Sequence, residues 1–274
     1  MFSAPGMCAQ ACYARHVAND HYIPQFLTRP WEFGERRLRV FDFCTRSFED
    51  EQVKHLFAKR DLNSPALEKW FQRTIETPVG AFATRLRRGE HRDPSQDWTT
   101  LRALALLFLL NPQRIQEARW PEAIPEPLED FATWPVSKLD DFVRAIFLKF
   151  KVGLVTVPRE VFFTEMALFD YPMPEEPVLA LPLSLGHVLI AYSGPMSSDQ
   201  LCRNVNPKTL AGFSIGVGTN VHRVILSPGW REASLRNPDR VRDDLFELRT
   251  SVVAMFNLVG RASQLANLRG WQVT

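Results

Sequence analysis

The chain has 274 residues, of which 45% are hydrophobic and 23% charged, and this composition excludes a predominantly disordered protein. Its formal net charge is only +2, so overall charge gives no support for binding to nucleic acid or to an anionic membrane. The four cysteines, Cys8, Cys12, Cys44 and Cys202, are too few and too scattered for a disulfide framework. They favour reduced thiols in a cytoplasmic protein that has no disulfide-linked partner.

Residues 1–18 are predicted to form a flexible leader ahead of a single domain that covers residues 19–274. The first residues include no continuous apolar segment of the kind found in signal peptides. The most apolar run, residues 101–110, contains an arginine and is about half as long as a membrane span. It is interpreted as a buried helix, and no membrane partner is expected.

The first elements are a strand and a kinked helix. Residues 37–43, RLRVFDF, alternate basic and apolar side chains and predict a strand with one exposed face. A short helix is expected over residues 50–57. Ser64 and Pro65 suit the N-cap and first position of a long helix that runs to about residue 88, and Pro78 is expected to kink it.

Two further helices are expected before the strands. The first begins at Thr99 or Thr100 and reaches about residue 120, with a bend at Pro112. Residues 121–135 are rich in proline and acidic residues and are typical of a connector. A third helix is expected over residues 138–151, with Ser137 as its N-cap.

The second half of the chain is rich in short β-branched and aromatic runs, which predict antiparallel strands. These runs cover residues 152–157, 161–164, 178–181, 187–192 and 220–226. A helix that opens at Ser197 is expected to include Asn206, and a long final helix covers residues 240–267. Because helices and strands are segregated, we expect an α+β fold, with a helical half packed on a mostly antiparallel sheet and a long C-terminal helix.

The segment HYIPQFL, residues 21–27, resembles the opening HYVPQFYL pattern of a bacterial family catalogued as domain of unknown function 4238. The strand at residues 38–43 matches the one that follows this pattern in the family. Glu68 and Glu76 fall where the family carries glutamates on its first long helix.

Later segments are also similar to this family, in the same order. Residues 112–114, PQR, with Arg119 behind them, match a helix that ends in a Q-x-R or QR pattern. Residues 161–164, VFFT, resemble the start of its FITSDNP segment, and residues 182–184 and Asn206 resemble its later P-L-S and asparagine positions. The resemblance covers about residues 21–226 and implies the α+β fold, but the family name carries no activity. The chain departs from it at Glu165–Leu168, EMAL, which replaces Ser-Asp-Asn-Pro and puts the activity of this segment in doubt.

The candidate site residues follow from these positions, and each has a structural alternative. The candidate catalytic residues are His21, Glu68, Glu76 and Glu165, and the candidate substrate-binding residues are Gln25, Gln113, Arg114 and Asn206. His21 suits a general base or metal ligand, or a hydrogen bond that holds the start of the fold. Glu68 and Glu76 either contribute carboxylates to one pocket or form solvated ion pairs. Arg114 either binds a phosphate or forms a structural ion pair.

Four arginines, Arg85, Arg87, Arg88 and Arg92, form the main basic cluster. They are interpreted as a solvated helix end, and contact with a phosphate is the alternative interpretation. His222 and Arg223 are expected on opposite faces of a strand, the exposed one being inert.

Two functions remain open. In the first, five of the candidates converge in one cleft and hydrolyse a phosphodiester of nucleic acid, and they are His21, Glu68, Glu76, Arg114 and Glu165. A divalent metal is a compatible cofactor, and bacterial defence is a compatible role. In the second, the protein is a non-catalytic binding or regulatory protein, whose partner is a nucleic acid or a protein and whose polar residues hold the same fold together. The change after Thr164 favours the second function.

Overall fold

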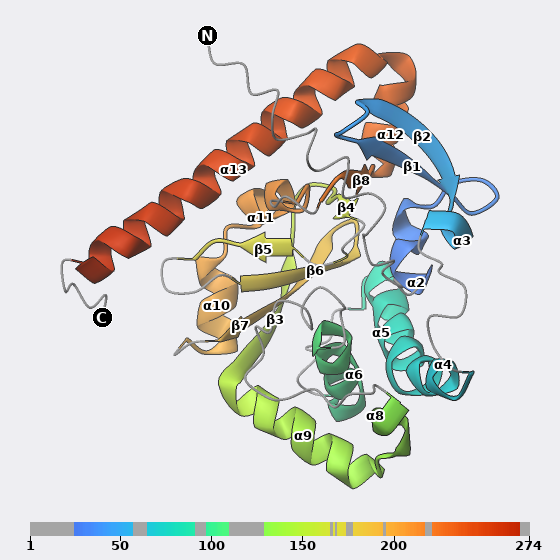
Figure 1. Ribbon diagram of the computed structural model, residues 1–274, viewed down its shortest axis with the longest axis vertical. Coiled ribbons are helices and arrows are strands. Elements are labelled where there is room, and N and C mark those ends of the chain that lie inside the picture. Colours follow the sequence, from blue (N-terminus) through green and yellow to red (C-terminus); the bar gives the residue numbers. More distant parts are fainter. Residues whose placement is uncertain are drawn as a thin grey trace.

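The computed structural model describes residues 25–56, 65–90, 97–109, 129–164, 167, 169–173, 178–193, 196–216 and 221–268. In these residues the chain forms two four-stranded antiparallel sheets, helices from its first half, and a long C-terminal helix, α13 (Pro238–Leu268). Figure 1 shows α13 passing along both sheets and projecting beyond them at its C-terminal end. The predicted α+β class is confirmed, although the strands form two sheets instead of one.

The first sheet has the order β2-β1-β8-β4. Its strands are β1 (Arg37–Asp42), β2 (Ser47–Gln52), β8 (Arg223–Ile225) and β4 (Phe163–Thr164). The strand predicted over residues 37–43 is confirmed, but the helix predicted over residues 50–57 is wrong at its start. Asp50 pairs with Arg39 across β1 and β2 and accepts a hydrogen bond from its guanidinium at 2.9 Å. Cross-strand pairing therefore holds residues 50–52 in a strand, and helix α3 (Val53–Leu56) begins only after it.

Segments from both ends of the described chain meet in this sheet. Strand β1 pairs with β8, and the rings of Phe41 and Phe43 lie 5.9 and 5.5 Å from the ring of Phe246 on α13. The indole N–H of Trp31, in the short helix η2 (Arg29–Trp31), donates to the carbonyl of Val161 at 2.8 Å. The first sheet therefore depends on contacts between residues that are far apart in sequence.

The second sheet has the order β3-β7-β6-β5. Its strands are β3 (Phe150–Thr156), β7 (His187–Ser193), β6 (Val178–Ser184) and β5 (Phe169–Tyr171). Every side chain of β6 is buried, so both of its faces are covered. Pro182 is tolerated because β5 pairs with β6 only as far as Ala180, and the β6–β7 ladder has a register shift between Pro182 and Ser184.

The helix predicted over residues 65–88 is present and is irregular near Pro78. It consists of α4 (Pro65–Phe71), a π-helical turn, η3 (Gln72–Glu76), and α5 (Thr77–Arg87). Pro78 has no N–H for a hydrogen bond to the preceding turn, and the N–H of Thr77 reaches five residues back to the carbonyl of Gln72. The predicted kink is thus accommodated as a wide turn that ends at Glu76.

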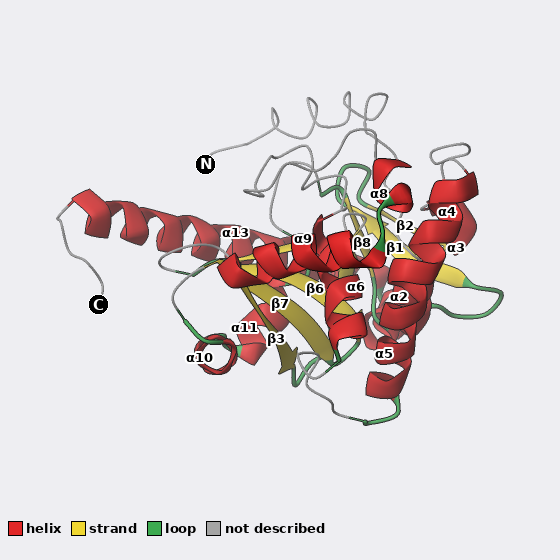
Figure 2. Ribbon diagram, turned by 90° about the horizontal axis from the view of Figure 1, so that it is seen from below, coloured by secondary structure: helices red, strands yellow, loops and turns green. Residues whose placement is uncertain are grey.

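The next helices are α6 (Trp98–Leu109), α8 (Glu129–Thr133) and α9 (Val136–Lys149). The carboxylate of Asp97, rather than Thr99 or Thr100, caps α6, because it accepts hydrogen bonds from the N–H groups of both threonines. Helix α8 occupies part of the segment predicted as a connector. Figure 2, viewed from the side of α9 and α6, shows these helices lying across the strands of the second sheet.

Three short helices, α10, α11 and α12, precede α13. The single helix predicted from Ser197 through Asn206 is two helices, α10 (Ser198–Asn204) and α11 (Pro207–Phe213). The helix opens at Ser197 as predicted, and Ser197 is its N-cap in a reciprocal capping box with Gln200. Helix α12 (Pro228–Arg236), which was not predicted, precedes α13. None of the helices in the described ranges has the length and apolar character needed to span a membrane.

Candidate functional site

Most of the predicted site residues lie where the structure gives no side-chain position. His21, Gln113, Arg114 and Glu165 are outside the described residues. Gln25 lies at the start of α2 (Gln25–Thr28) and Glu68 lies on α4, but only the backbone of each is described. The predicted convergence of His21, Glu68, Glu76, Arg114 and Glu165 in one cleft therefore stays a prediction. Of the eight candidate residues, Glu76 and Asn206 are the two whose surroundings are defined.

Glu76 lines a polar pocket of about 470 Å³ between α2 and the irregular helix. We call it the arginine pocket, and its lining residues include Phe26, Arg29, Glu76, Thr84, Arg85 and Arg88. Three positive side chains and one negative side chain thus face the same space. The predicted basic cluster at the end of α5 contributes two of the arginines, and Arg29 joins them from a segment far away in sequence.

The pocket exists because α2 lies very close to α5. A side-chain carbon added at Gly80 would lie in van der Waals contact with the ring of Phe26, at 3.5 Å, so Phe26 of α2 packs directly over Gly80 of α5. The π-helical turn before α5 brings Glu76 to the edge of this contact. Turns of this type are often found at functional sites because they change the direction of a side chain without ending the helix.

The electrostatics of the pocket favour an anion. Partial burial of the Arg87 guanidinium and the nearby positive charge of Arg29 lower the pKa of Arg87 from its ordinary value, although it stays protonated at physiological pH. Arg87 donates to the hydroxyl of Thr84 at 2.8 Å, which holds its guanidinium beside the pocket.

Among the described residues, Arg85 forms one ion pair, with Asp97. Its guanidinium lies 3.7 Å from the carboxylate of Asp97, whose pKa is lowered mainly by the hydrogen bond from the Thr100 hydroxyl. The buried Nε of Arg85 has no hydrogen-bond partner among the described residues. A phosphate oxygen in the pocket would therefore offer an acceptor to arginines whose positive charge is only partly balanced.

Asn206 is not in the arginine pocket. Its side-chain oxygen accepts hydrogen bonds from the N–H groups of Lys208 at 3.0 Å and Thr209 at 3.2 Å, and it is the N-cap of α11. These bonds satisfy two N–H groups of the first turn, which otherwise have no partner in the helix. The side chain predicted to bind substrate therefore has a complete structural explanation.

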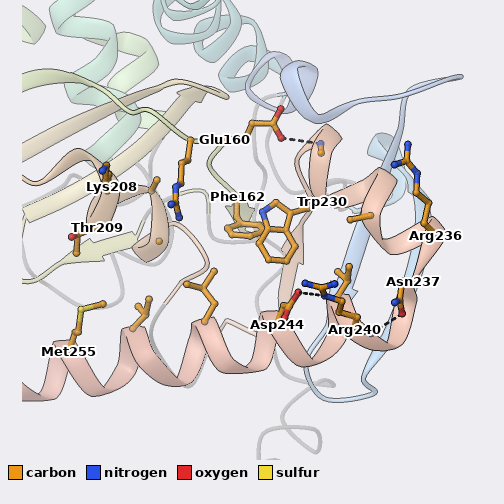
Figure 3. Close-up of a pocket in the computed structure, with 18 residues that line it drawn as sticks. Glu160, Phe162, Lys208, Thr209, Trp230, Arg236, Asn237, Arg240, Asp244 and Met255 are labelled. Atoms are coloured by element: carbon orange, nitrogen blue, oxygen red, sulfur yellow. Dashed lines mark hydrogen bonds and ion pairs between the residues drawn. The ribbon is translucent and has the colours of Figure 1, made fainter.

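A larger pocket of about 870 Å³ lies between α11, α12 and α13, and we call it the apolar groove. Buried apolar side chains form its floor, including Phe162, Ala211, Val241 and Val252. Figure 3 shows the rings of Phe162 and Trp230 side by side at its centre, above α13. Lys208, Thr209 and Met255 lie towards one end, and Arg236, Asn237 and Arg240 lie towards the other. The arginine pocket and the apolar groove share no lining residue.

Two hydrogen bonds fix the segment that forms the wall of the groove. The hydroxyl of the fully buried Ser214 accepts from the N–H of Phe162 at 2.8 Å and donates to the carbonyl of Ala211. The carboxylate of Glu160 accepts from the N–H of Gly229 at 3.0 Å, in the first turn of α12. The Phe162 ring is thereby held 5.2 Å from the Trp230 ring.

Sequence reasoning missed one close pair of reactive side chains. The Sγ of Cys44 lies 3.5 Å from the Nδ1 of His222, at the end of the first sheet. The buried carboxylate of Asp42 accepts from the N–H groups of Cys44 and Thr45 and shapes this turn. A separation of 178 residues hides the pair from any local motif. The expectation that either His222 or Arg223 is exposed is wrong, because both are partly buried and Arg223 forms ion pairs with Glu49 and Glu51.

Among the residues that the structure describes, no three His, Cys, Asp or Glu side chains are grouped closely enough to hold a metal ion. Cys44 and Cys202, the two described cysteines, are both thiols. No protein-family model matches the chain, and no curated protein or solved structure is significantly similar to it. The resemblance described from the sequence therefore stays a prediction.

Proposed function

We propose that the protein binds nucleic acid in the cytoplasm through a phosphate group held in the arginine pocket. The observation that supports this proposal is the meeting of Arg29 with Arg85 and Arg88 in one pocket, beside the Arg87 guanidinium. Arginine suits phosphate because its planar guanidinium donates two parallel hydrogen bonds to the phosphate oxygens. The pocket is open and polar, as expected for a site that contacts the backbone of a strand.

Hydrolysis of the bound phosphodiester is the catalytic form of this proposal. Glu76 lies among the arginines, where its carboxylate would activate water or supply one ligand to a divalent metal. His21 belongs to the segment immediately before α2, which makes it the next candidate for this chemistry. Cleavage of foreign nucleic acid would give the protein a role in bacterial defence.

Binding is tested with labelled single-stranded and double-stranded DNA and RNA at several salt concentrations. The double variant Arg29→Gln and Arg88→Gln should weaken binding and should make affinity less dependent on salt. The logarithmic slope should fall by about 0.7 for each phosphate of a single strand that the variant no longer neutralises. Arg203→Gln on α10 is the matched control, since Arg203 is also exposed but lies outside both pockets. If the wild-type protein binds none of these nucleic acids, or the control has the same effect, the proposal is wrong.

Cleavage is tested separately, with the same substrates plus Mg²⁺ or Mn²⁺. Glu76→Gln should retain binding and abolish cleavage, because it keeps the shape of the side chain and removes its charge. His21→Ala is the second variant. Binding by the wild type without any cleavage would contradict the hydrolase hypothesis. The alternative function, a non-catalytic binding protein, would then be retained.

A further inference from the structure

The apolar groove is long and continuous along one face of α13. Its lining residues on this helix recur at helical spacing, and they are Arg240, Val241, Asp244, Leu248, Val252 and Met255. Fifteen residues of α-helix rise about 22 Å. The groove is therefore an extended channel with an apolar floor, and its volume of about 870 Å³ is in the range of small-molecule sites.

The charges at the rim are not balanced. The groove is lined by four basic and two acidic residues, and both acidic residues already have partners. Glu160 accepts from the N–H of Gly229, and Asp244 lies 3.8 Å from Arg240. Of the basic residues, Arg240 therefore has a counter-ion, and Arg236 has one in Glu232 at 3.5 Å.

The two other cations are Arg159 and Lys208, and both are exposed at the rim. Within the described part of the chain, neither side chain forms an ion pair or a side-chain hydrogen bond. Lys208 lies towards the end of the groove that also holds Met255 (Figure 3). An apolar channel bordered by two such cations matches a ligand that has an apolar body and an anionic head.

We propose that the apolar groove binds a medium- or long-chain aliphatic carboxylate. Its chain lies along α13, against Leu248, Val252 and the Trp230 ring, and its carboxylate is bound by Lys208 and Arg159. This site is separate from the proposed phosphate site, because the two pockets share no lining residue, and it requires no nucleic acid.

The lining favours this ligand over a nucleic acid strand. A single strand binds by stacking successive bases on several aromatic rings, and in the groove Trp230 is partly exposed while the second ring, Phe162, is 2% exposed.

The proposal is tested by calorimetric titration of the full-length protein with decanoate, with decanol as the uncharged analogue and decyltrimethylammonium as the cationic one. Decanoate should saturate one site and bind at least about tenfold more tightly than either analogue, because only its head can pair with the two cations. Lys208→Gln combined with Arg159→Gln should remove that preference, and it should leave decanol binding unchanged. Both residues are exposed, so this variant keeps the fold.

A second pair of variants on α13 locates the site. Met255→Glu places a negative charge at the Lys208 end of the groove and should weaken decanoate binding by about tenfold. Val253→Glu is the matched control, since Val253 is 37% exposed and Met255 is 39% exposed, but Val253 does not line the groove. Three outcomes would overturn the proposal: no saturable decanoate binding, equal binding of the cationic analogue, or equal weakening in the control. Displacement of decanoate by a single-stranded oligonucleotide would assign the groove to nucleic acid and would also overturn it.

Discussion

At Asp140, two donors from α6 meet one carboxylate of α9. Its Oδ1 accepts from the guanidinium of Arg102 at 2.7 Å and from the indole N–H of Trp98 at 3.0 Å. Burial by itself would raise the pKa of Asp140, but these hydrogen bonds outweigh that effect and lower it. The ionised carboxylate is therefore part of the contact between the two helices, and sequence reasoning singled out none of these three residues.

Asp140→Asn should lower the free energy of unfolding by about 1–2 kcal/mol near neutral pH, since it removes a partly buried charged acceptor of two hydrogen bonds. Because the pKa is lowered in the folded state, this stabilisation is present above about pH 4, the ordinary range of Asp, and is lost as pH falls through the lowered pKa. Urea unfolding at neutral pH and at about pH 3 should show the difference between variant and wild type becoming smaller at acidic pH. The exposed neighbour provides the control Asp141→Asn, and an Asp140→Asn effect that does not change with pH would contradict the prediction.

At the scale of elements, short side chains at helix ends decide where the helices begin. Ser197, Asn206 and Asp97 each accept hydrogen bonds from the first turn of a helix. The cap at Ser197 was predictable because the residue type and its position before the helix agree. Asn206 was assigned to a helix interior and, through the family resemblance, to substrate binding. The Asn206–Pro207 pair is a local signal for a new helix start, of the same kind as Ser64–Pro65, and it was missed.

Asn206→Ala should lower the free energy of unfolding by about 1 kcal/mol, because the two N–H groups of α11 lose their acceptor. Asn206→Asp should restore stability, since aspartate caps helices equally well. Chemical unfolding and nucleic-acid binding are measured on the same variants. Weaker nucleic-acid binding by Asn206→Ala at unchanged stability would contradict the capping role and favour substrate binding by Asn206.

At the scale of the whole molecule, the two halves of the described chain are joined by long-range contacts. Strand β1 pairs with β8 in the first sheet, and α5 packs on β6 of the second. The indole of Trp31 reaches Val161 across 130 residues. The first sheet is built from strands of both halves, whereas the second sheet lies within residues 150–193 and is joined to the first half through α5. The single domain stays a prediction, and these contacts lead us to expect that the two halves unfold together.

Urea unfolding followed by far-UV circular dichroism and by tryptophan fluorescence should therefore give one transition with coincident midpoints. Trp31→Phe should lower the free energy of unfolding by about 1–2 kcal/mol as measured by both probes, since it leaves the buried carbonyl of Val161 without its donor. Two separated transitions, or a Trp31→Phe effect on one probe alone, would show that the halves unfold independently.

The candidate site was predictable only where it is local in sequence. The arginines at the end of α5 stand out as a cluster, and Glu76 was selected because it falls where the resembled family carries a glutamate on its first long helix. Arg29, which completes the pocket, has no local sequence signal. Its position near the α5 arginines depends on Phe26 packing against Gly80. The apolar groove was not predicted at all, since its walls come from three helices and one of them, α12, was missed.

The sequence by itself determined the fold class and most of the strands and helices, because apolar spacing, proline and capping residues act over a few neighbouring residues. Only the tertiary structure decided how the strands divide into two sheets, which arginines face Glu76, and that Cys44 lies beside His222. These features depend on contacts between segments that are far apart in the chain, and such contacts are set by how apolar faces pack together rather than by any local pattern.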